Sequence, residues 1–187
     1  MPRHIDVDGL FDATVTVFAK RGYRATTTQE IANRAGVNEV TLFRRYGDKA
    51  TLVDTALTHA LAKSPFARLA VTDDVTADLV VLVRAYAETV EKYGGAVVTL
   101  LVEVPRHPEL RAAMAAFMPN LLNAVQVIAT HQDRGQLTQG DPIEKLLMLI
   151  APLMMFGLWA RTGAEMIMSE FDPNVFVTAF LDGHRAS

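Results

Sequence analysis

The chain has 187 residues, of which 50% are hydrophobic and 21% are charged, so it has the composition of a globular protein and not of a disordered one. The absence of cysteine excludes disulfides, thiolate nucleophiles and Cys-ligated zinc. Acidic residues within the first fifteen positions argue against a signal peptide, and the longest strongly apolar run, 146–160, is shorter than the roughly 20 residues of a membrane span. We therefore expect a cytoplasmic protein that does not cross a membrane.

The charge is distributed unevenly along the chain. The whole sequence has a formal net charge of −3, yet residues 20–49 contain seven Lys and Arg against three Asp and Glu. A basic N-terminal segment on an acidic body is typical of a protein that contacts a polyanion locally. A solvated basic surface without a partner is the alternative reading of the same counts.

The N-terminal third predicts four helices. An apolar stripe over 7–18 recurs with helical spacing, and Gly22 after two cations is typical of a helix end. Thr27 followed three positions later by Glu30 is a capping box for a helix over 28–35. Short polar residues and glycines then delimit a helix over 39–46 and a longer one over 48–63.

The remaining two thirds predict about five more helices and no strand. The boundaries are set by glycine pairs, prolines and Asp-Pro signatures, and the helices are expected over 76–92, 96–104, 109–134 (kinked near Pro119), 143–161 and from 173 onward. Ser64-Pro65 marks the likeliest junction in the sequence, so we predict an all-α chain with domains over 1–63 and 64–187.

Two short helices joined by a glycine-containing turn have the dimensions of a helix-turn-helix. In the second helix Leu42 is the natural inward anchor, which leaves the neighbouring polar side chains and Arg44 and Arg45 on exposed faces. Arginine can donate two hydrogen bonds to guanine in the major groove, while Thr28 and Lys49 can reach flanking phosphates. An ordinary helical hairpin with exposed arginines remains the alternative.

The segment 13–52 resembles the DNA-binding domain of the TetR family of bacterial transcriptional regulators. The matching positions agree at fixed offsets without a gap: Phe18, Gly22-Tyr23, Thr26-Thr27, Ile31-Ala32, Ala35-Gly36-Val37, Thr41-Leu42-Phe43, Tyr46, Lys49 and Leu52. The resemblance implies an N-terminal three-helix helix-turn-helix domain and a larger C-terminal helical domain that binds an effector and forms the dimer.

The resemblance also implies roles for individual residues. Positions that hold the phosphate backbone would be Thr28, Thr41, Phe43 and Lys49, and positions that meet bases or nearby phosphates would be Gln29, Asn38, Glu39, Arg44 and Arg45. The chain departs from the family pattern with Phe43 in place of the usual Tyr, Arg45 in place of His, and Val40 in place of a small residue or Pro. These departures prevent the operator sequence from being carried over.

The predicted helix over 143–161 is apolar on nearly every side, so it needs cover on every side, from a partner subunit or around a ligand. The resemblance implies a homodimer through the last two helices, which would place two recognition helices about 34 Å apart on a palindromic operator. It also implies an effector cavity, for which our candidates are Tyr86, Glu103, Met114, Phe117, Met118, Leu121, Met155, Phe156 and Trp159. Plain core packing is the alternative for each, and we interpret His131 as a surface residue near a helix end.

No pattern in the sequence indicates an enzyme. The chain contains no G-x-S-x-G, no phosphate-binding glycine loop and no pair of histidines at metal-binding helical spacing, so we expect no cofactor and no metal. The sequence predicts a DNA-binding transcriptional regulator that a hydrophobic small molecule releases from its operator. The resemblance to the TetR family implies that it is a repressor. A helical protein-interaction module without DNA binding is the alternative.

Overall fold

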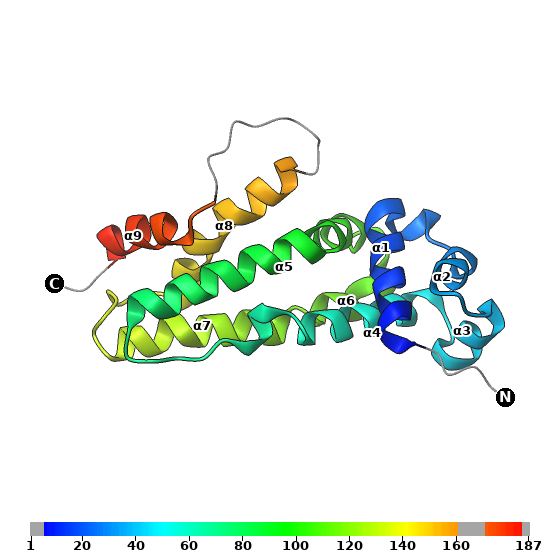
Figure 1. Cartoon of the computed structure of the whole chain (residues 1–187), viewed down its shortest axis with the longest axis horizontal. Helices are drawn as coiled ribbons and strands as arrows, with labels where there is room; N and C mark the ends of the chain where they lie inside the picture. Colours follow the sequence, from blue (N-terminus) through cyan, green and yellow to red (C-terminus); the bar gives the residue numbers. More distant parts are fainter. Residues whose placement is uncertain (1–5, 161–170, 185–187) are drawn as a thin grey trace. The chain divides into compact units, whose positions relative to one another are not determined.

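The computed structural model describes residues 6–160 and 171–184, and these residues form α-helices, two short 3-10 helices and no extended strand (Figure 1). The prediction of an all-α protein is therefore confirmed. The helices are α1 (Val7–Ala25), α2 (Thr28–Ala35), α3 (Glu39–Tyr46), α4 (Lys49–Ala62), α5 (Val75–Glu103), α6 (Arg111–Ala115), α7 (Met118–Asp133), α8 (Pro142–Ala160) and α9 (Pro173–His184), with 3-10 turns η1 (Pro65–Arg68) and η2 (Pro108–Leu110).

The chain divides into two compact units that are not simple consecutive segments. The first unit contains residues 1–63 together with 95–118, and the second contains 64–94 together with 119–187. The helix α5 therefore belongs to the second unit up to Gly94 and to the first unit from Gly95 onward. The sequence predicts a single domain boundary after residue 63. In the structure, residues 95–118 group with the N-terminal helices, although they follow that boundary.

The N-terminal helices begin where their capping residues predict. The side chains of Thr27, Asn38 and Asp48 accept hydrogen bonds from backbone N–H groups in the first turns of α2, α3 and α4, at 3.1, 2.8 and 2.8 Å. A full capping box would also have the Glu30 carboxylate accept from the Thr27 backbone N–H. Here that carboxylate accepts from Arg21 Nε at 3.2 Å instead. Each cap satisfies a donor that the helix itself leaves unpaired.

The core of the first unit explains why α3 is so lightly anchored. Helices α1 and α4 supply large fully buried side chains such as Phe18 and Leu57, whereas α3 contributes Leu42 alone. A buried leucine stabilises by roughly 1.5–3 kcal/mol relative to an exposed one. Leu42, together with the Tyr46 ring, which lies 6.0 Å from the Phe11 ring, fixes one face of α3 against the unit and leaves the opposite face open.

Two predicted helix boundaries are wrong. Gly94 and Gly95 do not end a helix but lie buried within the continuous α5, because a glycine weakens a helix by about 1 kcal/mol without breaking it when its surroundings are packed. The single helix expected over 109–134 is instead η2, α6 and α7, and the kink predicted near Pro119 is a bend of 41° at residues 116 and 117. Pro119 lies in the first turn of α7, where its missing N–H leaves no hydrogen bond unmade.

The second unit has an apolar core from α5, α7, α8 and α9, and beside it a buried polar network. His131 is 0% exposed, with Nε2 at 2.9 Å from Asp78 Oδ2 and Nδ1 at 2.6 Å from Gln136 Oε1. The interpretation of His131 as a surface residue is therefore wrong. The chain after α7 folds back over the histidine and supplies Gln136, a contact that helix periodicity cannot reveal.

Candidate nucleic-acid interface

Helix α3 presents most of its side chains to solvent. Val40 is 71% exposed and Phe43 is 51% exposed, and Arg44 and Arg45 are exposed as well, while Thr41 is partly buried. An eight-residue helix with most of its side chains exposed is narrow enough for a major groove about 12 Å wide. The exposed face therefore combines two apolar side chains with two permanent cations.

The two arginines of α3 are free of carboxylate partners among the described residues. Arg45 places its guanidinium carbon 5.6 Å from the centroid of the Tyr46 ring, within the range of a cation–π contact. That contact orients the side chain without neutralising its charge. Both guanidinium groups therefore keep their hydrogen-bond donors for an anionic or acceptor-rich partner.

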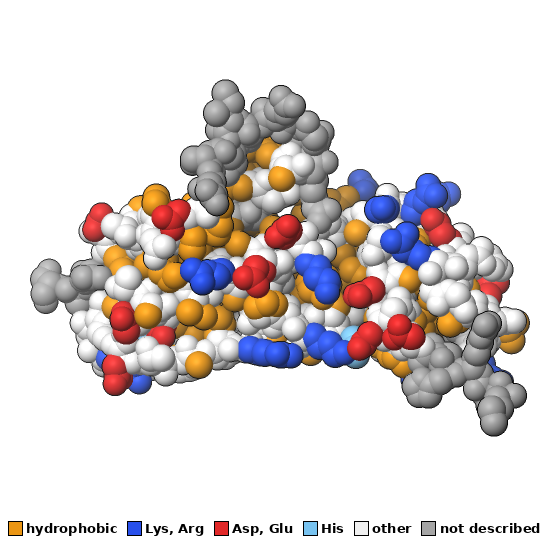
Figure 2. Space-filling model, viewed as in Figure 1, with side chains coloured by type: hydrophobic (Ala, Val, Ile, Leu, Met, Phe, Trp, Pro, Cys, Tyr) orange, Lys and Arg blue, Asp and Glu red, His pale blue; other side chains and the backbone are white. Residues whose placement is uncertain are grey.

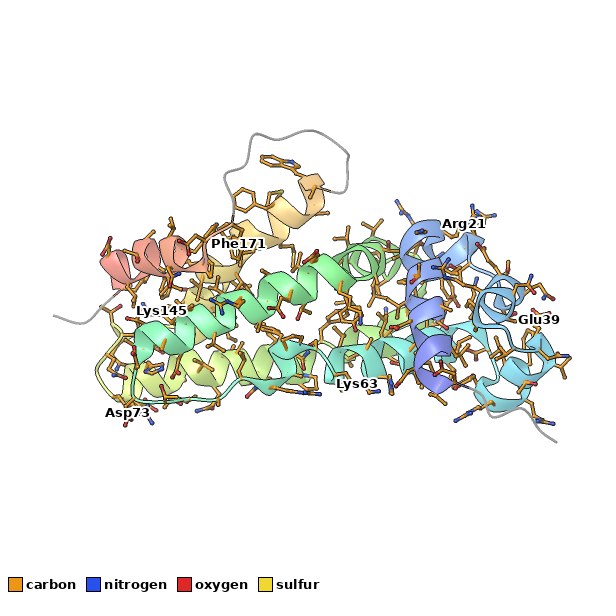
Figure 3. The ribbon with its side chains drawn as sticks, in the orientation of Figure 1. Arg21, Glu39, Lys63, Asp73, Lys145 and Phe171 are labelled. Atoms are coloured by element: carbon orange, nitrogen blue, oxygen red, sulfur yellow. The ribbon has the colours of Figure 1, made fainter. Side chains whose placement is uncertain are left out.

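Several other predicted contact residues already have hydrogen-bond partners within the first unit. Thr28 Oγ1 donates to Glu39 Oε1 at 2.6 Å, which joins the start of α2 to the start of α3. Gln29 Nε2 donates to Asn33 Oδ1 at 2.9 Å, and Asn38 is the α3 cap described above. Figure 3 shows Glu39 beside these two helices. The polar side chains around the turn therefore have defined positions before any partner arrives.

Lys49 is held inside the first unit. Its Nζ donates to the carbonyl oxygens of Tyr23 and Thr26 at 2.6 and 2.9 Å and lies 4.2 Å from the centroid of the Tyr23 ring. Partial burial lowers the pKa of Lys49, against the opposing effect of the Glu109 and Glu103 carboxylates. The ammonium thus connects α4 to the C-terminal end of α1 and its cap Thr26, a structural role that the motif alone did not reveal.

A second group of cations lies outside α3. Figure 2 shows Lys and Arg side chains gathered over the C-terminal end of α1, where Lys20, Arg21 and Arg24 are all exposed. Arg21 is paired with Glu30, whereas Lys20 and Arg24 have no carboxylate partner within the described part of the chain. The uneven charge count over 20–49 therefore corresponds to real surface charge, which adds phosphate-binding candidates that the motif did not single out.

The nine residues expected around an effector do not all lie in one unit. The first unit contains Glu103, Met114, Phe117 and Met118, and the second contains Tyr86, Leu121, Met155, Phe156 and Trp159. Within the second unit Tyr86 is a core residue, Leu121 and Phe156 pack against that core, and Met155 and Trp159 are exposed. Glu103 instead accepts a hydrogen bond from the Tyr23 backbone at 3.2 Å.

A cavity of about 390 Å³ in the second unit is lined by other residues, namely Thr76, Thr178, Leu181 and Asp182. None of the nine expected effector residues lines it. No group of three or more His, Asp or Glu side chains suited to a metal ion occurs within residues 6–160 and 171–184.

The fold and the exposed α3 define a helical protein with a helix-turn-helix. Residues 10–56 match the model of the bacterial regulatory proteins of the tetR family, and residues 69–166 match the tetracyclin repressor-like C-terminal domain. The chain therefore belongs to the TetR family of bacterial transcriptional regulators. Members of this family are regulators and not enzymes, which confirms that prediction from the sequence.

Similar proteins agree with this assignment. The chain is 48% identical over 48 residues to the uncharacterised HTH-type transcriptional regulator YvkB of Bacillus subtilis, and 42% identical over 48 residues to the HTH-type transcriptional repressor KstR2 of Rhodococcus jostii. Each match covers 26% of this chain and about a quarter of the relative (25% and 24%). The fatty acid degradation regulator FadR of Bacillus halodurans has the same fold, with a TM-score of 0.72 at 16% identity over 97% of this chain and 95% of its own.

Proposed function

We propose that this protein binds a palindromic DNA operator as a homodimer, represses transcription from it, and releases it when a hydrophobic small molecule binds. The observation that carries the proposal is the exposed face of α3, where Arg44 and Arg45 have no carboxylate partner among the described residues. A protein with this task works in the cytoplasm, where the DNA is. The relative KstR2 is named a repressor, which supports the sign of the regulation.

Dimer formation is supported by the apolar surface of the second unit. On α8 the side chains of Leu147, Met148, Met155 and Trp159 are all at least 47% exposed, and Val175 on α9 is 64% exposed. Figure 2 shows hydrophobic side chains at the surface over these helices. Such a contiguous apolar patch marks an interaction surface in most proteins. A second copy of the same two helices would cover it with two-fold symmetry.

By length and composition α8 is also apolar enough to cross a membrane, with a mean hydropathy of 1.7 over its most apolar window and 28% of that window buried. A dimer interface accounts for the same exposure without lipid. Sedimentation velocity in buffer without detergent separates the two explanations. A dimer that becomes a monomer on Leu147→Arg supports the interface, whereas aggregation relieved by detergent contradicts it.

The proposed effector is a hydrophobic molecule that contacts the apolar core of the second unit. Tyr86 lies in this apolar core, and its phenol O–H is a hydrogen-bond donor for a polar group on an apolar ligand. FadR of Bacillus halodurans is named a regulator of fatty acid degradation, which supports an aliphatic ligand class. Long-chain acyl compounds are accordingly the first effectors to test.

Binding to short duplexes from the chain's own promoter region tests the proposal. Wild-type affinity should fall steeply with salt, by about 0.9 log units per log salt for each phosphate contacted. Arg45→Ala should lose base discrimination, and Arg68→Ala, an exposed arginine on η1, is the matched control that should change nothing. Equal base discrimination by wild type and Arg45→Ala would show that Arg45 does not read bases. Failure of wild type to bind any duplex would favour a protein-interaction module instead.

A further inference from the structure

We infer that Glu39 is a base-reading residue that selects a cytosine in the operator half-site, and that Thr28 is the positioning residue that orients it. This inference rests on the proposed function and deepens it, because it names the base that one side chain recognises. The inference starts from the position of the Glu39 carboxylate, which lies on the same helix as the exposed cations Arg44 and Arg45.

Glu39 is the first residue of α3, next to its cap Asn38. Only one of the Glu39 carboxylate oxygens is engaged, because Oε1 accepts from Thr28 Oγ1 at 2.6 Å and no other hydrogen bond or ion pair to Glu39 occurs in the described part of the chain. The second oxygen keeps its capacity to accept.

The other acid on these two helices behaves differently. Glu30 on α2 is neutralised by Arg21 at 3.2 Å, whereas Glu39 has no cationic partner among the described residues. An unpaired carboxylate in a phosphate-binding surface costs affinity for every DNA sequence, because it repels the backbone. It contributes to binding only where a base edge offers a donor, which makes it a source of specificity.

The chemistry of the major groove then identifies the base. Cytosine presents an N4 amino donor there and no acceptor of its own, while adenine places the N7 acceptor directly beside its N6 donor. A carboxylate accepts from cytosine N4 without repulsion, but it opposes adenine N7. Guanine and thymine present acceptors, so they repel it as well. The hydrogen bond from the Thr28 hydroxyl fixes the orientation of the Glu39 carboxylate, so that its second oxygen is held in one direction toward the base.

Selection from a randomised duplex pool, followed by sequencing of the bound fraction, tests the inference with wild type, Glu39→Gln and Glu39→Ala. Wild type should enrich cytosine at one position of each half-site. Glu39→Gln should lose that preference and enrich adenine there, because an amide can bind adenine N6 and N7 together. Glu39→Ala should accept any base at that position and bind random-sequence DNA more tightly than wild type.

The size of the effect follows from the value of one base contact. Replacing the selected cytosine should weaken wild-type binding roughly tenfold and should leave Glu39→Ala binding nearly unchanged. Glu30→Gln is the matched control, since it removes the same charge from α2 and should leave the selected sequence unaltered. Thr28→Val should blur the cytosine preference, and Thr28→Ser, which keeps the hydroxyl, should restore it.

The outcomes separate this inference from the proposed function. If wild type and Glu39→Gln select the same half-site at every position, Glu39 is not a reader and the inference fails while DNA binding stands. If wild type enriches no duplex at all, the proposed function fails and the inference fails with it. Circular dichroism melting of each variant shows that a changed preference does not reflect unfolding.

Discussion

Glu103 Oε1 accepts a hydrogen bond from the backbone N–H of Tyr23 at 3.2 Å, although the two residues are 80 positions apart. The same oxygen lies 2.7 Å from the position that a β-carbon on Gly22 would occupy. The end of α5 is thus fitted to Gly22, at a kink in the last part of α1, shortly before α2 begins. Within the first unit, this contact connects the later part of the chain to the proposed DNA-binding helices.

Gly22→Ala should therefore destabilise the protein by about 2–4 kcal/mol. Gly22 has φ 72° and ψ 173°, a backbone region nearly exclusive to glycine, which accounts for roughly 1–3 kcal/mol. The added methyl also displaces the Glu103 carboxylate, which loses a hydrogen bond worth about 1 kcal/mol. The free energy of unfolding from urea titration measures the loss.

Gly36→Ala is the matched control, because Gly36 also has a positive φ of 67° but nothing within 4 Å of an added β-carbon. It should cost only the backbone penalty of about 1 kcal/mol. In a Glu103→Ala background Gly22→Ala should cost less than in wild type. Equal costs in both backgrounds would show that the carboxylate contact is unimportant.

Lys49→Met should lower stability by about 2 kcal/mol and leave the salt dependence of DNA binding unchanged. The substitution keeps the aliphatic stem and removes an ammonium that donates to Tyr23 O and Thr26 O. Hydrogen bonds from charged groups contribute about 1.5–3 kcal/mol each, partly offset by the burial cost that the charge no longer incurs. Urea unfolding and a salt titration of operator affinity give the two quantities.

Arg44→Ala is the comparison for Lys49→Met. Arg44 is exposed, so its removal should not lower stability. If Arg44 contacts a phosphate, its removal should reduce the slope of log affinity against log salt by about 0.9. A similar reduction by Lys49→Met would mean that the ammonium leaves its carbonyls for a phosphate in the complex. The implied phosphate role of Lys49 would then be correct.

The sequence predicts local structure well where a side chain acts on its own neighbours. The caps Thr27, Asn38 and Asp48 fix where three helices begin, and the single anchor Leu42 fixes which face of α3 is buried. These relationships span only a few residues. They follow from hydrogen-bond geometry and helical periodicity, so they can be read before any tertiary structure is known.

Contacts over long sequence separations could not be predicted in this way. Nothing in the spacing of Glu103 or Lys49 indicates that one binds the Tyr23 N–H and the other the Tyr23 carbonyl. The continuity of α5 through Gly94 likewise depends on burial by other elements, which propensity ignores. The sequence therefore suggests a phosphate contact for Lys49 and an effector contact for Glu103, but it does not show that both side chains bind the Tyr23 backbone.

Asp78→Asn should destabilise the protein by about 1–3 kcal/mol at neutral pH, because it removes the carboxylate that binds the buried His131 ring and the Thr72 backbone. Gln136 Nε2 donates to Asp73 O, so its Oε1 faces His131 Nδ1, and both ring nitrogens meet acceptors. Unfolding by urea at pH 7 measures the loss, and Asp133→Asn, an exposed acid on α7, is the control.

The same pair predicts a pH dependence. Burial opposes ionisation of Asp78, but hydrogen bonds from Thr72 and His131 outweigh it and hold the pKa of the carboxyl below its ordinary value of 3.8. Ionised Asp78 thus stabilises the fold above pH 3.8, and this contribution disappears as the pH falls through the folded pKa. Wild type should lose stability below about pH 4 more steeply than Asp78→Asn; parallel curves would contradict the assignment.

Gly157→Ala should destabilise the second unit by about 1–3 kcal/mol, although alanine favours a helix by about 1 kcal/mol. A β-carbon on Gly157 in α8 would lie 2.4 Å from Val90 Cγ1 on α5, and a valine in a helix has little freedom to rotate away. Val90→Ala should remove the conflict, so the double variant should recover most of the loss. Thermal melts measure these differences. Gly183→Ala on α9, where nothing lies within 4 Å of an added β-carbon, is the control and should be neutral or stabilising. A neutral Gly157→Ala would mean that α8 and α5 are not in close contact at this position.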